Sequence, residues 1–319
     1  MKSHRAERVE QLLEKGFSLL DQGRYAEALE VSAELEGQRH SAAFEIGALA
    51  HLGRGDLTDA IDVLKRGVEA APTVWVLWQL LGNCESDQGR YSAAEDAYRQ
   101  ALDCRGVWKE SVLLNRAILA ARDGRFEESL DQLAGIDDPS LEIEVAKARI
   151  NSLIGAGDPH RAAEEARLRL AELHSAGNQE EAGELGGLLA RALLAADVGH
   201  DQIRAGALAA LRECRGNEDA LWVLRELDGE AAAGNSYLRI LLHGRLRPEL
   251  ADLHGGALGY YSTVDVIAES LEDALRFVWP LEEDAASLLQ VAESEVLEPR
   301  PNALKGVYAQ NDRSFYLAD

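Results

Sequence analysis

A glycine recurs at an almost constant interval along the first half of this chain. The four positions are Gly23, Gly55, Gly89 and Gly124, with spacings of 32, 34 and 35 residues. Three of these glycines precede an arginine and an aromatic residue, and each lies just before a segment with helical patterning. A period near 34 residues is typical of stacked helix-turn-helix units, so the spacing predicts an α-solenoid.

The third copy of the pattern is the most complete. Its characteristic residues, in chain order, are Trp78, Leu81, Gly82, Gly89, Tyr91, Ala94, Tyr98 and Ala101. We expect Gly82 and Ala94 to be small because the two helices of the unit cross there. Gly89 is expected to end the first helix, since glycine adopts a positive φ without steric cost.

This order of residues resembles the tetratricopeptide repeat (TPR), and the resemblance covers about residues 9–215. It implies a mainly α fold: a right-handed TPR-type solenoid of about six units with a capping helix, over 1–228. The expected units are roughly 9–40, 41–74, a third that starts near Trp75, 110–140, 143–177 and 180–215. The fifth unit has Pro159 where the aromatic residue belongs, and the sixth retains little of the pattern. A non-repetitive helical bundle is the alternative.

The patterning changes after Leu227, and the segment 229–235 is interpreted as a linker. Beyond it, a period of two predicts strands at 237–243, 257–267 and 288–297, with a helix at 270–279 capped by Ser270 and followed by Pro280. Residues 306–309 and 314–317 are predicted to form a final hairpin. The order β-β-α-β-β-β predicts a small α+β domain with an antiparallel sheet over 235–319. Its sequence resembles no family that we recognise.

The formal net charge of −23 narrows the class of partner. An acidic surface repels phosphate groups, so nucleic acids and anionic membranes are disfavoured, and a basic or apolar protein surface is favoured. The charge alternatively serves solubility alone. No signal-peptide pattern and no apolar run of about 18 residues occurs, which predicts a soluble, cytoplasmic protein. The preference for arginine over lysine and the abundance of alanine favour a bacterial source.

No motif of a known catalytic site occurs, so the chain is predicted not to be an enzyme and to need no cofactor or metal. The loop 244–256 and its flanks contain acidic, basic and cationic side chains, namely His243, Arg245, Arg247, Glu249, Asp252 and His254. It is either a small-ligand or anion site, or a solvated loop with scattered charges. The acidic run 282–284 is interpreted as a solvated turn, and Glu293 and Glu295 as an exposed strand face. The three cysteines fit neither a disulfide framework nor a zinc site.

The TPR resemblance implies that the first helices of successive units line a concave groove that binds peptides. The positions it selects are Leu13, Phe17, Leu20, Glu45, Leu49, Leu52, Gln79, Asn83, Ser86, Leu114, Ile118, Lys147 and Asn151. Packing against the chain itself is the alternative role of these residues. Lys147 and Asn151 match the opening pair of the clamp with which TPR co-chaperones hold acidic C-terminal tails. Gly186 and Ala190 stand where the clamp needs polar contacts, so we reject that function.

The resulting hypothesis is a non-enzymatic adapter or scaffold that binds a protein or peptide in the groove, with homo-oligomers possible. Two alternatives stay open: an acidic, immunity-like neutraliser or regulator of a basic protein, and a small-ligand sensor or enzyme seated in the C-terminal domain.

Overall fold

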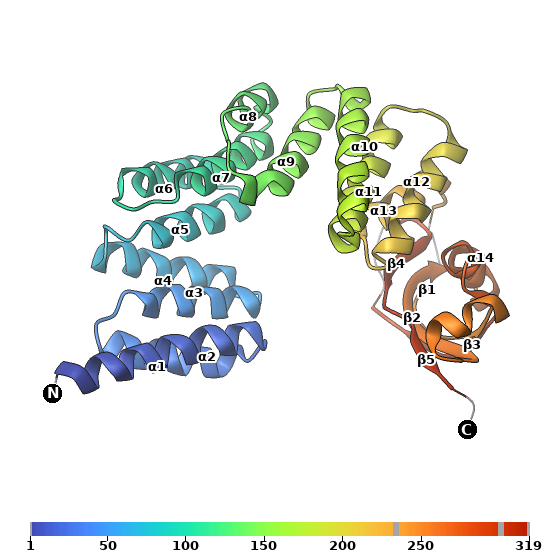
Figure 1. Cartoon of the computed structure of the whole chain (residues 1–319), viewed down its shortest axis with the longest axis horizontal. Coiled ribbons are helices and arrows are strands. Elements are labelled where there is room, and N and C mark those ends of the chain that lie inside the picture. The colour runs from blue at the N-terminus through green and yellow to red at the C-terminus, as the bar shows by residue number, and fades with distance from the viewer. Residues whose placement is uncertain (1, 232–235, 299–302, 318–319) are drawn as a thin grey trace. The chain divides into compact units, whose positions relative to one another are not determined.

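The computed structural model describes residues 2–231, 236–298 and 303–317, with side chains from residue 6 onward (Figure 1). The chain forms two compact units, Met1–Val145 and Ala146–Asp319. The predicted domain boundary lies elsewhere, at the 229–235 linker, of which 232–235 are outside the described residues. That boundary therefore stays a prediction.

The first unit consists of antiparallel helix pairs, as the period predicts (Figure 1). The helices are α1 (Lys2–Asp21), α2 (Tyr25–Gly37), α3 (Ala42–Gly53), α4 (Leu57–Ala70), α5 (Trp75–Asp87), α6 (Tyr91–Asp103), α7 (Lys109–Arg122) and α8 (Phe126–Leu133), followed by the short 3-10 turn η1 (Pro139–Leu141). These pairs correspond to the first four predicted units. The solenoid prediction is confirmed.

Two glycines of the third unit act as the sequence indicates. Gly89 has φ +72°, which lets the chain turn between α5 and α6. Gly82 lies where the two helices cross, and a Cβ atom added there would be 2.4 Å from the Tyr98 ring. The Tyr98 hydroxyl then donates to the Asn83 side chain at 2.7 Å. The close crossing thus needs a residue without a side chain.

No single core holds this unit together. One cluster joins α1, α2 and α3, and a second joins α3, α4 and α5; their members include Leu19, Leu35 and Ile46, and Phe44, Leu64 and Leu77. Each cluster spans neighbouring pairs only, which is how repeat arrays distribute their stability.

The second unit starts with five more helices. They are α9 (Glu142–Gly155), α10 (Pro159–Ala176), α11 (Gln179–Ala195), α12 (His200–Glu213) and α13 (Glu218–Asp228). Pro159, which breaks the repeat pattern, occupies the first turn of α10, where Asp158 accepts a bond from the Arg161 N–H at 3.3 Å. Proline is tolerated at that position because its missing N–H has no helical partner. The predicted capping helix is α13.

The described C-terminal residues form one antiparallel sheet, one α-helix and two short 3-10 turns, η2 (Pro248–Leu250) and η3 (Asp252–His254). The strands are β1 (Ser236–Leu246), β2 (Gly259–Ala268), β3 (Ala286–Val296), β4 (Gly306–Gln310) and β5 (Ser314–Tyr316), and the helix is α14 (Leu271–Glu282). The sheet order is β3-β1-β2-β4, with β5 also on β2. Alternate β1 residues, among them Ile240 and Leu242, are buried, and α14 contacts β2, β3 and β4. The predicted β-β-α-β-β-β order is confirmed.

The predicted final hairpin is wrong. Tyr316 pairs with Gly259, and Gln310 pairs with Val264, so β4 and β5 both pair with β2. They run in line along one edge of β2, and the Asn311 N–H between them donates to the Thr263 carbonyl at 3.0 Å. The reason is that β2 offers a free edge long enough for both segments.

The predicted end of the last helix, before Pro280, is also wrong. Pro280 lies inside α14, which continues to Glu282. The start is as predicted: the Ser270 hydroxyl accepts a bond from the Asp273 N–H at 3.1 Å. The longer helix carries the Glu282 side chain into the interior.

Glu282 is fully buried, although the sequence analysis interpreted 282–284 as a solvated turn. Its carboxylate accepts from the Tyr260 hydroxyl at 2.6 Å, the Gln310 amide at 2.8 Å and the Arg313 guanidinium at 2.9 Å. Arg215, in the turn between α12 and α13, also donates to it. These four donors compensate the desolvation of the Glu282 carboxylate, and together they connect the last turn of α14 to the sheet.

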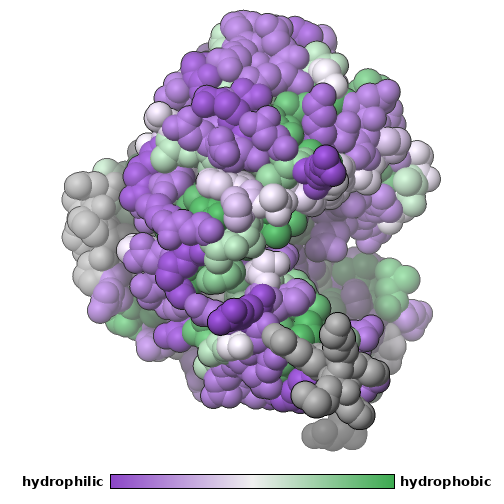
Figure 2. All heavy atoms as spheres, turned by 90° about the vertical axis from the view of Figure 1, so that its left-hand side faces the viewer, coloured by the Kyte–Doolittle hydropathy of each residue, from purple (hydrophilic) through white to green (hydrophobic). Residues whose placement is uncertain are grey.

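Among the described residues, no helix has both the length and the hydropathy that a membrane-spanning segment needs. The face in Figure 2 is largely hydrophilic, with smaller hydrophobic patches between the polar areas.

Candidate functional site

The first helices of the N-terminal pairs form one layer. α1 contacts α3, α3 contacts α5, and α5 contacts α7, whereas no comparable contact joins α2 to α4 or α4 to α6 among the described residues. Helices that approach each other more closely lie on the inside of a curved array. The predicted groove positions on α1, α3, α5 and α7 therefore lie on the inner layer of this unit.

At the N-terminal end, this layer offers an exposed aromatic ring. Phe17 is 37 % exposed, while Leu13 and Leu20 are half-buried and pack on the cluster that joins α1 to α3. The helices touch at the preceding residue, because a Cβ atom on Gly16 would lie 2.6 Å from Ile46 Cδ1. Phe17 is thus free on one side, and the two leucines serve largely as internal packing.

Glu45, beside Ile46 on α3, is a half-buried carboxylate. No hydrogen bond or ion pair joins it to another described residue. Burial raises the pKa of Glu45 above the ordinary value, because the surroundings disfavour the charged form. Leu49 and Leu52 on the same helix are half-buried, and Leu52 packs on the second cluster. A desolvated carboxylate next to apolar side chains is suited to a cationic group of a partner.

The polar positions of the third unit are bonded within the array. The Gln79 amide donates to the Ser111 hydroxyl at 2.8 Å, and Arg122 donates to the Ser86 hydroxyl at 3.0 Å. Both bonds connect α5 to α7, so these side chains fix the spacing of neighbouring pairs.

Exposure also differs among the remaining positions. Ser86 and Leu114 are buried, which leaves them little surface for a partner. Asn83 and Ile118 are half-buried.

Lys147 and Asn151 belong to the second unit and contact α11. Lys147 pairs with Glu184, and the Asn151 side-chain oxygen accepts from Arg191 at 3.1 Å. Gly186 packs against α12, since a Cβ atom there would lie 2.9 Å from the Ala210 Cβ. Both polar side chains are already engaged, which agrees with rejecting a clamp for acidic tails.

The six charged residues near the β1–β2 loop do not form one site. His243 lies on β1 and stacks on Tyr261, with its Nε2 atom 2.6 Å from the Tyr316 hydroxyl. His254 stacks on Phe315, with ring centroids 4.0 Å apart. The Arg247 guanidinium donates to the Glu283 carbonyl at 2.8 Å and lies 3.9 Å from the Glu249 carboxylate. Arg245 and Asp252 are exposed.

One histidine–carboxylate group was missed by the sequence analysis. The Nδ1 atom of His51 is buried without a hydrogen-bond partner and lies 3.9 Å from a carboxylate oxygen of both Asp56 and Asp59. The spacing of the three residues across the Gly55 turn is the signal that indicates it, because His51 lies on the helix before the turn and the two aspartates follow it. Arg54 lies 3.3 Å from Asp56, so that carboxylate already has a cationic neighbour, and we assign no metal.

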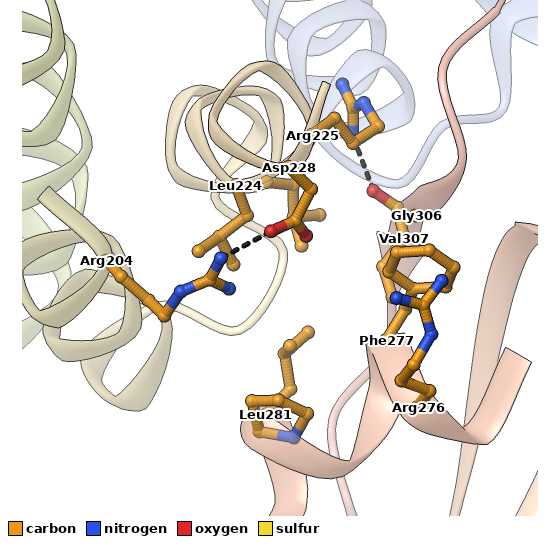
Figure 3. Close-up of a pocket in the computed structure, with 11 residues that line it drawn as sticks. Arg204, Leu224, Arg225, Asp228, Arg276, Phe277, Leu281, Gly306 and Val307 are labelled. Carbon is orange, nitrogen blue, oxygen red and sulfur yellow. Dashed lines mark hydrogen bonds and ion pairs between the residues drawn. The ribbon is translucent and has the colours of Figure 1, made fainter. Parts of the chain in front are cut away.

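A cavity of about 220 Å³ lies between α12, α13, α14 and β4 (Figure 3). Arg204 pairs with Asp228, and Arg225 donates to the Val307 carbonyl, as the dashed lines in Figure 3 show. The third arginine, Arg276, donates two hydrogen bonds to the Glu230 carboxylate, at 2.7 and 2.9 Å. Glu230 is not among the residues labelled in Figure 3. Because these guanidinium groups are paired, the cavity does not present a free anion site.

Comparison with known proteins identifies the fold of the helical repeats. A family model described as the tetratricopeptide repeat matches residues 76–104. No curated protein matches the chain. A solved tetratricopeptide repeat protein from Parabacteroides merdae is 11 % identical, with a TM-score of 0.57 over 70 % of this chain and 86 % of that one. The pilF structure from Pseudomonas aeruginosa is 16 % identical, with a TM-score of 0.50 over 70 % and 99 % of the two chains. At these identities the likeness concerns the fold. Residues 76–104 are therefore a tetratricopeptide repeat, and the helical part of the chain has the fold of tetratricopeptide-repeat proteins.

Proposed function

We propose that this protein is a non-enzymatic adapter that binds a protein partner on the inner layer formed by α1, α3, α5 and α7. The observation that supports this most is Glu45, a half-buried carboxylate without a partner among the described residues and with a raised pKa. Retaining such a group costs stability, which is typical of a binding position. Phe17, one residue beyond the α1–α3 contact, supplies an exposed aromatic anchor.

The partner segment that fits these two residues has an apolar side chain and a lysine or arginine close together. The apolar group would pack on Phe17, and the cation would pair with Glu45. The predicted groove positions on α5 contribute less to binding this segment, because Gln79 and Ser86 are bonded to α7.

The test is affinity capture from native extract, quantified by mass spectrometry, with the double variant Phe17→Ser/Glu45→Gln. Leu168→Ser is the matched control, since Leu168 on α10 is 62 % exposed and lies outside the inner layer. We expect a partner that the wild type and the control retain and the double variant loses. Recovery of the same proteins by all three would contradict the proposal.

The net charge of −23 favours a second candidate, a neutraliser or regulator of a basic protein. Association would then be steered by charge over long distances, and its rate constant would fall steeply with added salt. A rate constant that is independent of salt would exclude this candidate while leaving the adapter function intact. A cytoplasmic location likewise stays a prediction.

A further inference from the structure

β3 is an edge strand that lacks the cationic residues and prolines often found at sheet edges. Among the described strands it pairs only with β1, and its eleven residues include no lysine, arginine or proline. Sheets commonly carry such residues at their edges to prevent pairing with other chains. Two features limit pairing at this edge: a register shift opposite Leu241 and Leu242, which separates the second half of β3 from the first, and the exposed charges of Glu293 and Glu295. All residues from 292 to 296 are exposed.

The backbone of this second half offers hydrogen-bonding groups to a new strand. The Leu297 N–H donates to the Tyr237 carbonyl at 2.8 Å, and Glu295 lies opposite Arg239. In an antiparallel ladder, alternate residues direct their backbone groups toward and away from the neighbouring strand. The N–H and C=O groups of Ser294 and Val296 therefore point away from β1.

The side chains beside this edge determine which charge a strand that pairs with β3 should carry. Glu293 and Glu295 lie on the same face of the sheet, opposite Leu241 and Arg239, and both are exposed. Arg239 is bidentate to Asp265 on the far side, at 2.8 and 2.9 Å, so it does not bond to Glu295. Val296, on the opposite face, is 71 % exposed.

We propose that the outer edge of β3, from Ser294 to Leu297, pairs with an extended basic segment of a partner protein. Backbone bonds to Ser294 and Val296 would supply the affinity, as in strand addition generally. Lysine or arginine side chains at alternate positions would face Glu293 and Glu295, and an apolar side chain would cover Val296. Charge argues against a second copy of this chain as the occupant, because each copy carries −23. This surface is separate from the inner layer of the first unit.

The probe is a fluorescein-labelled peptide of nine residues with alternating lysine and valine, blocked at both ends, titrated by fluorescence anisotropy. A second peptide with the same side chains carries N-methyl groups on alternate residues, so that its charge is kept and its ladder bonds are lost. We expect the methylated peptide to bind the full chain about tenfold or more weakly, since two or more backbone bonds are missing. Equal binding of the two peptides overturns the proposal.

Variants of the strand locate the site. Ser294→Pro removes an outward N–H, a change that edge strands tolerate, and Ser294→Thr is the matched control. Glu293→Gln/Glu295→Gln removes the charge, and Glu226→Gln/Glu272→Gln, at two exposed positions of α13 and α14, is its control. We expect both strand variants to lose affinity and both controls to retain it. Loss in both charge variants alike would indicate unspecific attraction and overturn the proposal.

The remaining outcomes are also decisive. If Ser294→Pro changes the circular dichroism spectrum, that variant has altered the fold and its affinity is not used. The methylated peptide with the wild type, and the Glu293→Gln/Glu295→Gln variant with its control, then test the proposal on folded protein. If sedimentation shows that the wild type alone is a dimer that Ser294→Pro dissociates, a second copy occupies the edge and the proposal is wrong.

Discussion

Arg215, in the turn between α12 and α13, donates to the fully buried carboxylate of Glu282 at the end of α14. The two residues are 67 positions apart in the chain. Arg313 approaches the same carboxylate from the segment before β5. One buried anion therefore joins the turn between α12 and α13, the end of α14 and the segment before β5.

The first prediction concerns this anion. Glu282→Gln leaves Arg215 and Arg313 without their buried counter-charge, and we expect a loss of about 3 kcal/mol in the free energy of unfolding. Urea unfolding followed by circular dichroism measures it. Glu283→Gln, at the exposed neighbouring position, is the control and should change stability by less than about 0.5 kcal/mol. A loss below about 1 kcal/mol for Glu282→Gln would mean that the network contributes little.

The second prediction concerns helix crossing. Gly82→Ala places a Cβ atom 2.4 Å from the Tyr98 ring, and we expect a destabilisation of about 1–3 kcal/mol. Gly37→Ala, on α2, is the control because nothing lies within 4 Å of its added Cβ atom. The control should be neutral or slightly stabilising, since alanine is the better helix former. Thermal unfolding of both variants separates crowding from helix propensity; equal midpoints would contradict the crowding.

The third prediction is a pH dependence at Glu45. Its pKa is raised in the folded state by burial, so the ionised form destabilises the fold above that pKa. Glu45→Gln should raise the unfolding midpoint at pH 7. The gain should shrink as the pH falls through the folded-state pKa and disappear below the ordinary glutamate value of 4.5, where the wild-type carboxyl is protonated in both states. Thermal scans from pH 4 to 8 measure it, and a constant difference across that range would disagree with the assignment.

The fourth prediction concerns the thiols. Burial raises the pKa of Cys84 to about 11; it also raises the pKa of Cys104 and Cys214, but these two thiols are only half-buried and a reagent can reach them. The thiolate is the reactive form, so Cys84 should not react with a disulfide reagent at pH 8 until the protein unfolds. We expect two rapid equivalents per chain in the native state and a third in denaturant. Comparison with Cys84→Ala identifies the slow thiol, and three rapid equivalents in native protein would refute the burial.

The α-solenoid was predictable because its determinants are local and repeated. Gly89 specifies a turn by its own backbone freedom, and Gly82 and Tyr98, which pack on each other, belong to the same repeat unit. The strand order was predictable for a similar reason, since alternating patterns such as that of β1 need no knowledge of their neighbours. Strand partners were not predictable in this way: only residues 311–313 separate β4 from β5, yet both strands pair with β2 instead of with each other.

The candidate binding positions were selected by register, and the structure separates them by environment. Phe17 is exposed, Leu114 is buried, and Gln79 is used to hold α7, although the pattern treats the three alike. Register gives the face of a helix on which a residue lies; it does not give the distance of the next helix.

By itself, the sequence determined the repeat length, the helix pairs, the place of the glycine turns and the order of strands, because each follows from contacts between residues close in the chain. The tertiary structure decided which charges are buried and which edges are free. Glu282 lies in an acidic run that resembles a surface turn, and it is interior only because Arg215, Tyr260, Gln310 and Arg313 converge on it from three other segments of the chain. The desolvation of a charge depends on all the atoms around it, and no local pattern in the chain records them.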